Sequence, residues 1–68
     1  MISFVLDTPY IELIKLLKVT RVAESGGAAK SLVESGQVYR NDRPESRKRA
    51  KIVKGEVISV MGKSIRVV

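Results

Sequence analysis

The spacing of apolar residues changes at Gly36, and this change most constrains the fold of the 68-residue chain. Before Gly36, apolar residues recur at helical intervals. After it, they occupy short extended segments separated by turn-forming residues. The pattern predicts an α+β domain in which two helices pack on one face of a small antiparallel β-sheet. The expected helices are residues 9–18 and 25–36, and the expected strands are 2–6, 37–40, 51–53, 56–60 and 64–68.

Both predicted helices have recognisable ends and apolar faces. We expect Thr8 to cap the first helix, with Pro9 at its first position. We expect Ser25 to cap the second and Gly36 to end it in a left-handed conformation. The predicted buried faces are Tyr10, Leu13, Ile14 and Leu17 in the first helix, and Ala28, Ala29, Leu32 and Val33 in the second.

Length and composition exclude several classes of protein. A chain of 68 residues is expected to form one domain, residues 1–68, with a stability of roughly 3–10 kcal/mol. It has no cysteine and no histidine, so the sequence suggests neither a disulfide framework nor a metal site. The apolar start lacks the features of a signal peptide, and no apolar run is long enough to span a membrane, so we expect a cytoplasmic protein.

Positive charge is concentrated between Arg40 and Lys54. This basic segment (residues 40–54) contains seven of the thirteen basic residues and two acids, so it carries +5 of the formal net charge of +6. A clustered positive field is typical of nucleic-acid binding. Within it, the run from Arg47 to Lys51 combines arginine forks, which bind phosphate oxygens in pairs, with lysine point charges. A solvated loop that only aids solubility is the alternative interpretation, and Arg43 and Lys54 are expected to be peripheral.

The start of the second predicted helix is a candidate phosphate site. The first N–H groups of a helix have no intrahelical acceptor, so they can bind an anion without a basic side chain. Gly26 and Gly27 would let a phosphate approach closely, and Lys30 and Arg21 could add charge. The alternative interpretation is that Ser25 is only a good cap and that the glycines only form a tight entry to the helix.

Several segments in this order resemble the S-four type RNA-binding domain, also called the alpha-L motif. They are residues 23–38, Asn41-Asp42, Arg47-Lys48-Arg49 and residues 54–58. The resemblance covers about residues 10–60 and is greatest to small free-standing bacterial members. It implies the same helix pair on a small sheet, and structured RNA, especially ribosomal RNA, as the target. The chain departs from the family pattern in three places. Gly26 replaces a frequent arginine, Arg40 replaces an apolar residue, and Pro44 favours a loop after the turn.

We therefore predict a non-enzymatic, monomeric RNA-binding module without a cofactor or metal. Tyr39 is the one candidate for stacking on an RNA base, and a single ring does not make a surface that reads unpaired bases. We therefore expect the chain to recognise RNA by its shape and backbone. A protein–protein adaptor with a basic face, in a ribosome-associated complex, is the alternative, and a binder of duplex DNA is disfavoured because neither helix has a base-reading face. The predicted RNA contacts are Arg21, Ser25, Gly26, Gly27, Lys30, Arg40, Arg47, Lys48, Arg49 and Lys51.

Overall fold

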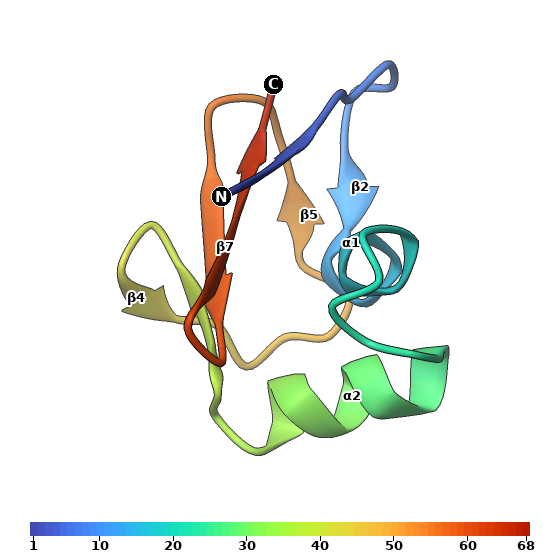
Figure 1. Cartoon of the computed structure of the whole chain (residues 1–68), viewed down its shortest axis with the longest axis vertical. Helices are drawn as coiled ribbons and strands as arrows, with labels where there is room; N and C mark the ends of the chain where they lie inside the picture. The colour runs from blue at the N-terminus through green and yellow to red at the C-terminus, as the bar shows by residue number, and fades with distance from the viewer.

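A five-stranded sheet organises the domain, and the computed structural model describes all 68 residues (Figure 1). The elements are β1 (Ile2–Phe4), β2 (Ile11–Glu12), α1 (Leu13–Val19), α2 (Gly26–Glu34), β3 (Val38–Arg40), β4 (Arg43–Pro44), β5 (Lys51–Ile52), β6 (Val57–Val60) and β7 (Lys63–Val67). The strand order in the five-stranded sheet is β1-β7-β6-β3-β4, and strands β2 and β5 form a separate two-stranded sheet.

The α+β class predicted from the sequence is confirmed, but the sheet is mixed rather than wholly antiparallel. Strand β1 pairs with β7 in parallel, and all other neighbours are antiparallel. Backbone hydrogen bonds from Val68 N to Phe4 O (2.8 Å) and from Leu6 N to Val68 O (2.7 Å) continue the β1–β7 contact beyond the strands. Consequently, both ends of the chain lie together at one edge of the molecule (Figure 1).

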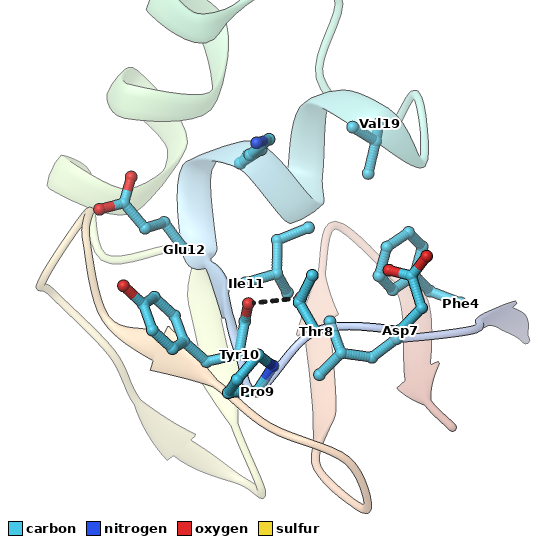
Figure 2. Close-up of a pocket in the computed structure, with 10 residues that line it drawn as sticks. Phe4, Asp7, Thr8, Pro9, Tyr10, Ile11, Glu12 and Val19 are labelled. Atoms are coloured by element: carbon cyan, nitrogen blue, oxygen red, sulfur yellow. Dashed lines mark hydrogen bonds between the residues drawn. The ribbon is translucent and has the colours of Figure 1, made fainter.

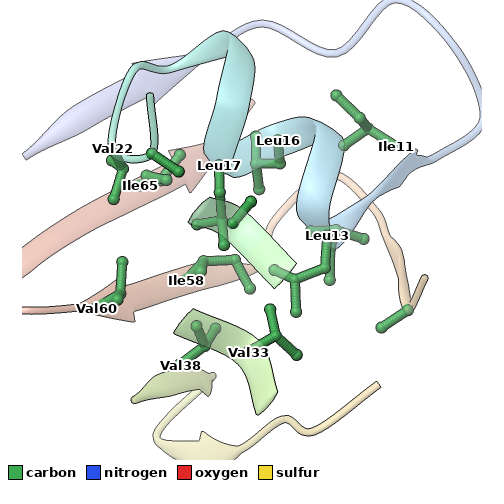
Figure 3. Packing of buried hydrophobic residues seen from close by; sticks show 14 of the residues in the cluster. Ile11, Leu13, Leu16, Leu17, Val22, Val33, Val38, Ile58, Val60 and Ile65 are labelled. Carbon is green, nitrogen blue, oxygen red and sulfur yellow. The ribbon is translucent and has the colours of Figure 1, made fainter. Parts of the chain in front are cut away.

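Both helices cover the same face of this sheet. Ile58, Val60, Ile65 and Val67 point toward the helices and are buried, whereas the residues that alternate with them are less buried. Figure 3 shows Leu17 of α1 directed toward Ile58 of β6. Sixteen buried apolar residues form a single core, with Leu32, Ala28, Ile14, Phe4 and Ile2 packed against it as half-buried neighbours. Neither helix is long and apolar enough to cross a membrane.

The first helix begins four residues later than the sequence predicts. Residues 11–12 pair with β5 as strand β2 instead of forming a helical turn, so α1 starts at Leu13. The Thr8 hydroxyl donates to the carbonyl oxygen of Tyr10 at 2.9 Å, and Thr8 caps no helix. Tyr10 is consequently 42% exposed and outside the buried stripe, in which Leu16 takes its place beside the correctly predicted Leu13 and Leu17.

The ends of the second helix are confirmed. The Ser25 hydroxyl accepts a hydrogen bond from the N–H of Ala28 at 3.1 Å, as an N-cap does. Gly36 has a φ of 78°, in the left-handed region that commonly follows a helix. Ala29 and Val33 are fully buried, so the predicted apolar face is the one that packs on the core.

The prediction that Pro44 favours a loop after the turn, rather than a continuous hairpin, is wrong. Asn41 and Asp42 both have positive φ angles, 51° and 68°, which form a tight two-residue turn. Beyond the turn, β4 pairs with β3 in the register Tyr39↔Pro44. Proline is tolerated there because β4 is an edge strand and needs no outward N–H. The resulting hairpin holds the start of the basic segment against the sheet.

Candidate functional site

The basic segment runs from the five-stranded sheet past the first helix. After β4 it passes the start of α1 and then enters β5 (Figure 1). The carbonyl oxygens of Lys48 and Ala50 accept hydrogen bonds from the N–H groups of Ile14 and Leu13, at 3.1 and 2.9 Å. These N–H groups lie in the first turn of α1, where no intrahelical acceptor exists. The segment is therefore fixed to the folded domain at its middle as well as at both strands.

Arg40 lies at the centre of an ion-pair network. Its Nε and Nη2 donate to the two carboxylate oxygens of Glu56 at 2.7 and 2.8 Å, and Nη1 donates to Glu45 at 3.2 Å. Nη2 also donates to the carbonyl oxygen of Lys51 at 2.8 Å. Glu45 accepts further hydrogen bonds from Arg47, at 3.1 Å from Nε, 3.3 Å from Nη2 and 3.2 Å from the backbone N–H. Two guanidinium groups and two carboxylates thus form a group with no net charge.

The network keeps its carboxylates ionised. The Arg47 guanidinium lowers the pKa of Glu45 below its ordinary value of 4.5, and the Arg40 guanidinium does the same for the pKa of Glu56. Both carboxylate side chains are largely buried, at 10% and 15% exposed. Hydrogen bonding to Glu56 in turn raises the pKa of Arg40. At neutral pH all four groups are therefore charged and mutually paired.

The predicted RNA contacts of the basic segment differ in how free they are. Four of the five N–H donors of Arg40 are engaged within the chain, and its side chain is only 23% exposed. Arg47 is paired with Glu45 but remains 73% exposed. Arg49 is exposed and has no ion pair, and the Lys51 ammonium lies 5.0 Å from the centre of the Tyr10 ring. The Lys48 side chain is 43% exposed and pairs with Glu34. The structure therefore separates a largely enclosed Arg40 from four basic side chains that solvent can reach.

The start of α2 has the open backbone that a phosphate site at this position requires. The N–H groups of Gly26 and Gly27 have no acceptor within the chain. A β-carbon built on Gly26 meets no atom within 4 Å, and one on Gly27 meets only the Ser25 hydroxyl at 3.8 Å. Neither glycine has a positive φ. Packing and backbone conformation thus require glycine at neither position, although glycine lowers helix stability relative to alanine.

One face of α2 connects the helix start to the basic segment. Gly26, Lys30 and Glu34 are spaced four residues apart, so they form a stripe along the helix. Glu34 lies eight positions after Gly26, so the stripe extends about 12 Å along the helix axis. At its far end the Lys48 ammonium lies 3.5 Å from the Glu34 carboxylate. The two parts of the predicted site therefore lie at opposite ends of α2, with the exposed Lys30 between them. Arg21 is exposed in the connector before the helix, with a φ of 62°.

Sequence reasoning missed the part played by the acids and by Arg43. A hollow of about 620 Å³, here called the hairpin hollow, is lined by polar residues and one proline. A neighbouring hollow of about 520 Å³ shares Arg40 and Arg47 with it. The sequence did contain a signal for these ion pairs, because Glu45 is an acid within a basic segment and pairs with Arg40 and Arg47. The hairpin hollow is lined by Arg40, Asn41, Arg43, Pro44, Glu45 and Arg47, and the neighbouring one by Arg40, Arg47, Arg49, Ala50 and Lys51.

Another hollow lies away from the predicted site. It has a volume of about 530 Å³ and lies between the N-terminal segment and α1, with Phe4, Asp7 and Val19 in its wall (Figure 2). None of the predicted RNA contacts lines it. Three or more metal-ligating side chains come together nowhere in the structure.

Comparison with known proteins identifies the same family as the sequence resemblance. The family model for the S4 domain matches residues 4–68. A relative from Escherichia coli (strain K12), YbcJ, which is named for RNA binding, is 45% identical over 60 residues, covering 88% of this chain and 86% of that protein. RlbA of Bacillus subtilis (strain 168), named for ribosome maturation, is 37% identical over 57 residues, covering 84% of this chain and 80% of that protein.

A solved structure has the same fold. The solution structure of E. coli YbcJ, described as revealing an alpha-L motif involved in RNA binding, superposes with a TM-score of 0.78 at 43% identity. The match covers 100% of this chain and 87% of that chain. The alpha-L fold predicted from the sequence is therefore confirmed.

Proposed function

This chain belongs to the S4 domain family, and we propose that it binds structured RNA, ribosomal RNA in particular, through the phosphate backbone. The main observation behind this proposal is that exposed cations of the basic segment lie at one end of the stripe formed by Gly26, Lys30 and Glu34 on α2. The names of YbcJ and RlbA, which refer to RNA binding and ribosome maturation, support RNA as the target and the ribosome as its setting. The family is a binding-domain family and not an enzyme class.

We infer an interface with two parts. At the start of α2, the free N–H groups of Gly26 and Gly27 donate to a phosphate oxygen, with Ser25, Lys30 and Arg21 around them. At the other end, Arg47, Lys48, Arg49 and Lys51 contact further phosphates. Lys48 compensates the charge of Glu34 on the stripe, so no uncompensated acid interrupts the path between the two parts. Arg40 has an indirect role, because Glu45 and Glu56 already hold its guanidinium.

The aromatic content favours recognition of RNA shape over recognition of unpaired bases. The chain has three aromatic residues, of which Phe4 is packed against the core and Tyr10 lies beside Lys51. Tyr10 and Tyr39 are equally exposed, but the Lys51 ammonium lies over the Tyr10 ring, so Tyr39 is the one exposed ring without a cation over it. Sequence-specific readers of single strands use several such rings. Paired regions or junctions, read through phosphates and sugar hydroxyls, are the better fit to this surface.

A salt titration of binding to a structured ribosomal RNA fragment tests the proposal. We expect tighter binding to the RNA than to a DNA duplex of equal length, and a log–log slope of about −3 to −5, since each phosphate neutralised contributes about −0.7 to −0.9. Weak binding that is equal on both nucleic acids would reject the RNA-binding function and favour a protein partner for the basic face.

Replacing Gly26 and Gly27 together with alanine tests the helix start separately. We expect RNA affinity to fall about tenfold, because two methyl groups cover the free N–H groups. Thermal stability should rise or stay unchanged, since alanine is the better helix former and the added atoms meet open space. A Ser31→Ala variant, changed on the same helix outside the stripe, serves as the control. Unchanged affinity in the glycine variant would remove the start of α2 from the interface.

A further inference from the structure

Glu45 has an unusual position for an acid within a surface proposed to bind phosphate. It is 8% exposed and is the one charged residue among the buried residues of the chain. Its two oxygens accept four hydrogen bonds, one from Arg40 and three from Arg47. A negative charge at this place repels phosphate, so a phosphate-binding surface that keeps it must gain something else from it. The contacts of Glu45 with Arg47 indicate what is gained.

Glu45 holds one edge of the Arg47 guanidinium and leaves the other edge free. The bound edge consists of Nε, 3.1 Å from Oε2, and Nη2, 3.3 Å from Oε1. A guanidinium has five N–H donors, so both hydrogens of Nη1 and one of Nη2 remain without a partner in the chain. Glu45 also binds the backbone N–H of Arg47 at 3.2 Å, which fixes the main chain from which the side chain extends. An otherwise flexible arginine is thereby held in one orientation.

Arg47 lines both the hairpin hollow and the neighbouring hollow, so this residue lies at the boundary between them. In the hairpin hollow, Arg43 is exposed and makes no ion pair within the chain. All residues that line this hollow are polar or proline. Paired guanidinium donors on a polar, positively charged wall suit a phosphodiester, which offers two anionic oxygens.

The following inference rests on the RNA-binding function proposed above. We propose that the hairpin hollow takes a backbone phosphate of RNA, bound by the free edge of Arg47 and by Arg43, and that Glu45 is the positioning residue for Arg47. On the side of the sheet, Arg40 forms an ion pair with Glu45, and Glu56 in turn forms an ion pair with Arg40. Glu45 thus strengthens binding of an anion although it is itself an anion, because a held arginine loses less conformational freedom when the phosphate arrives.

Two neutralising substitutions with opposite expected effects test this inference. Glu45→Gln and Glu34→Gln each raise the formal net charge from +6 to +7. The Glu34 side chain is 53% exposed and forms its one ion pair with Lys48, so neutralising it frees a cation, and RNA binding should tighten roughly two- to fivefold. Glu45→Gln should weaken binding at least about fivefold despite the added positive charge, because the guanidinium is no longer held. Tighter binding by the Glu45→Gln variant would overturn the positioning role.

Two further variants identify Arg47 as the residue through which Glu45 acts. In an Arg47→Ala background, adding Glu45→Gln should no longer weaken binding. Without Arg47 to position, the remaining effect of Glu45 on RNA is to repel phosphate, and glutamine removes that repulsion. Arg47→Lys keeps the charge but loses the fork, and it should weaken binding about as much as Glu45→Gln does. Binding by Arg47→Lys at the affinity of the unaltered protein would overturn the proposed phosphate contact, even if Glu45→Gln folds poorly.

The unaltered protein, titrated first with the same RNA, separates this inference from the function on which it rests. No binding by the unaltered protein would reject the RNA-binding function and the phosphate site with it. Binding by the unaltered protein together with tighter binding by both glutamine variants would leave the function intact and reject only the role of Glu45. Thermal melts of each variant, recorded beside the titrations, ensure that affinities are compared between folded proteins.

Discussion

Replacing Arg47, Lys48 and Arg49 together with alanine is expected to weaken binding to structured RNA on the order of 100-fold at 0.1 M salt. Each phosphate contact that is lost removes about 0.7 to 0.9 from the log–log salt slope, which corresponds to about five- to eightfold in affinity at this salt concentration. Three lost contacts should therefore reduce both the affinity and the slope, and the slope should become shallower by about 2 to 3. A salt titration of the triple variant beside the unaltered protein measures both quantities.

The fold should survive this change, because the contacts that fix the segment come from its backbone. The Lys48 carbonyl oxygen still accepts from Ile14, and the Ala50 carbonyl oxygen still accepts from Leu13. Glu45 keeps its partner Arg40 when Arg47 is removed. Circular dichroism and a thermal melt check this expectation.

A matched control separates the position of the charge from its amount. Lys18, Lys63 and Arg66 are exposed, form no ion pair and lie outside the proposed interface. Their joint replacement with alanine lowers the formal net charge from +6 to +3, as the test variant does. The control should lose much less affinity than the test variant. Equal losses would show that the protein attracts RNA by its overall charge and that the basic segment is not the interface.

Replacing Leu13 with alanine should destabilise the domain by about 2–5 kcal/mol, the usual range for a buried leucine. Leu13 is fully buried at the first position of α1, where its N–H also binds the basic segment. A domain of this size has roughly 3–10 kcal/mol of stability, so the variant should be partly or wholly unfolded at physiological temperature. Chemical denaturation followed by circular dichroism measures the loss.

Leu32→Ala provides the comparison for this experiment. The sequence pattern predicts that Leu32 is as buried as Leu13, but in the structure it is half-buried at the side of the core. Its truncation leaves a site partly open to water, so the loss of stability should be clearly smaller. A Leu32→Ala variant that is less stable than the Leu13→Ala variant would contradict this difference in packing.

The features predicted correctly from the sequence depend on residues close together in the chain. The cap at Ser25 and the left-handed Gly36 are decided within one helical turn, and the turn at Asn41-Asp42 within four residues. The buried face of α2 follows from helical spacing alone. The position of the positive charge follows from the order of the residues, because lysine and arginine carry their charge in any conformation.

The features that sequence reasoning missed depend on partners far along the chain. The start of α1 is shifted because residues 11–12 pair with β5, about 40 residues later. The parallel contact joins the first strand to the last. Arg40, expected at the RNA surface, binds Glu56, sixteen residues away. No local pattern encodes such pairs, because they form only when two elements take a particular register.

The sequence by itself therefore determined the α+β class, the ends and face of α2, and the segment that carries the charge. Tertiary structure alone decided which of those charges remain available. It neutralised Arg40 against Glu45 and Glu56, left one edge of Arg47 open, and placed Lys48 at the far end of the α2 stripe. The physical reason is that a cation in a sequence carries the same formal charge everywhere, whereas its capacity to bind phosphate depends on whether folding brings a carboxylate to it.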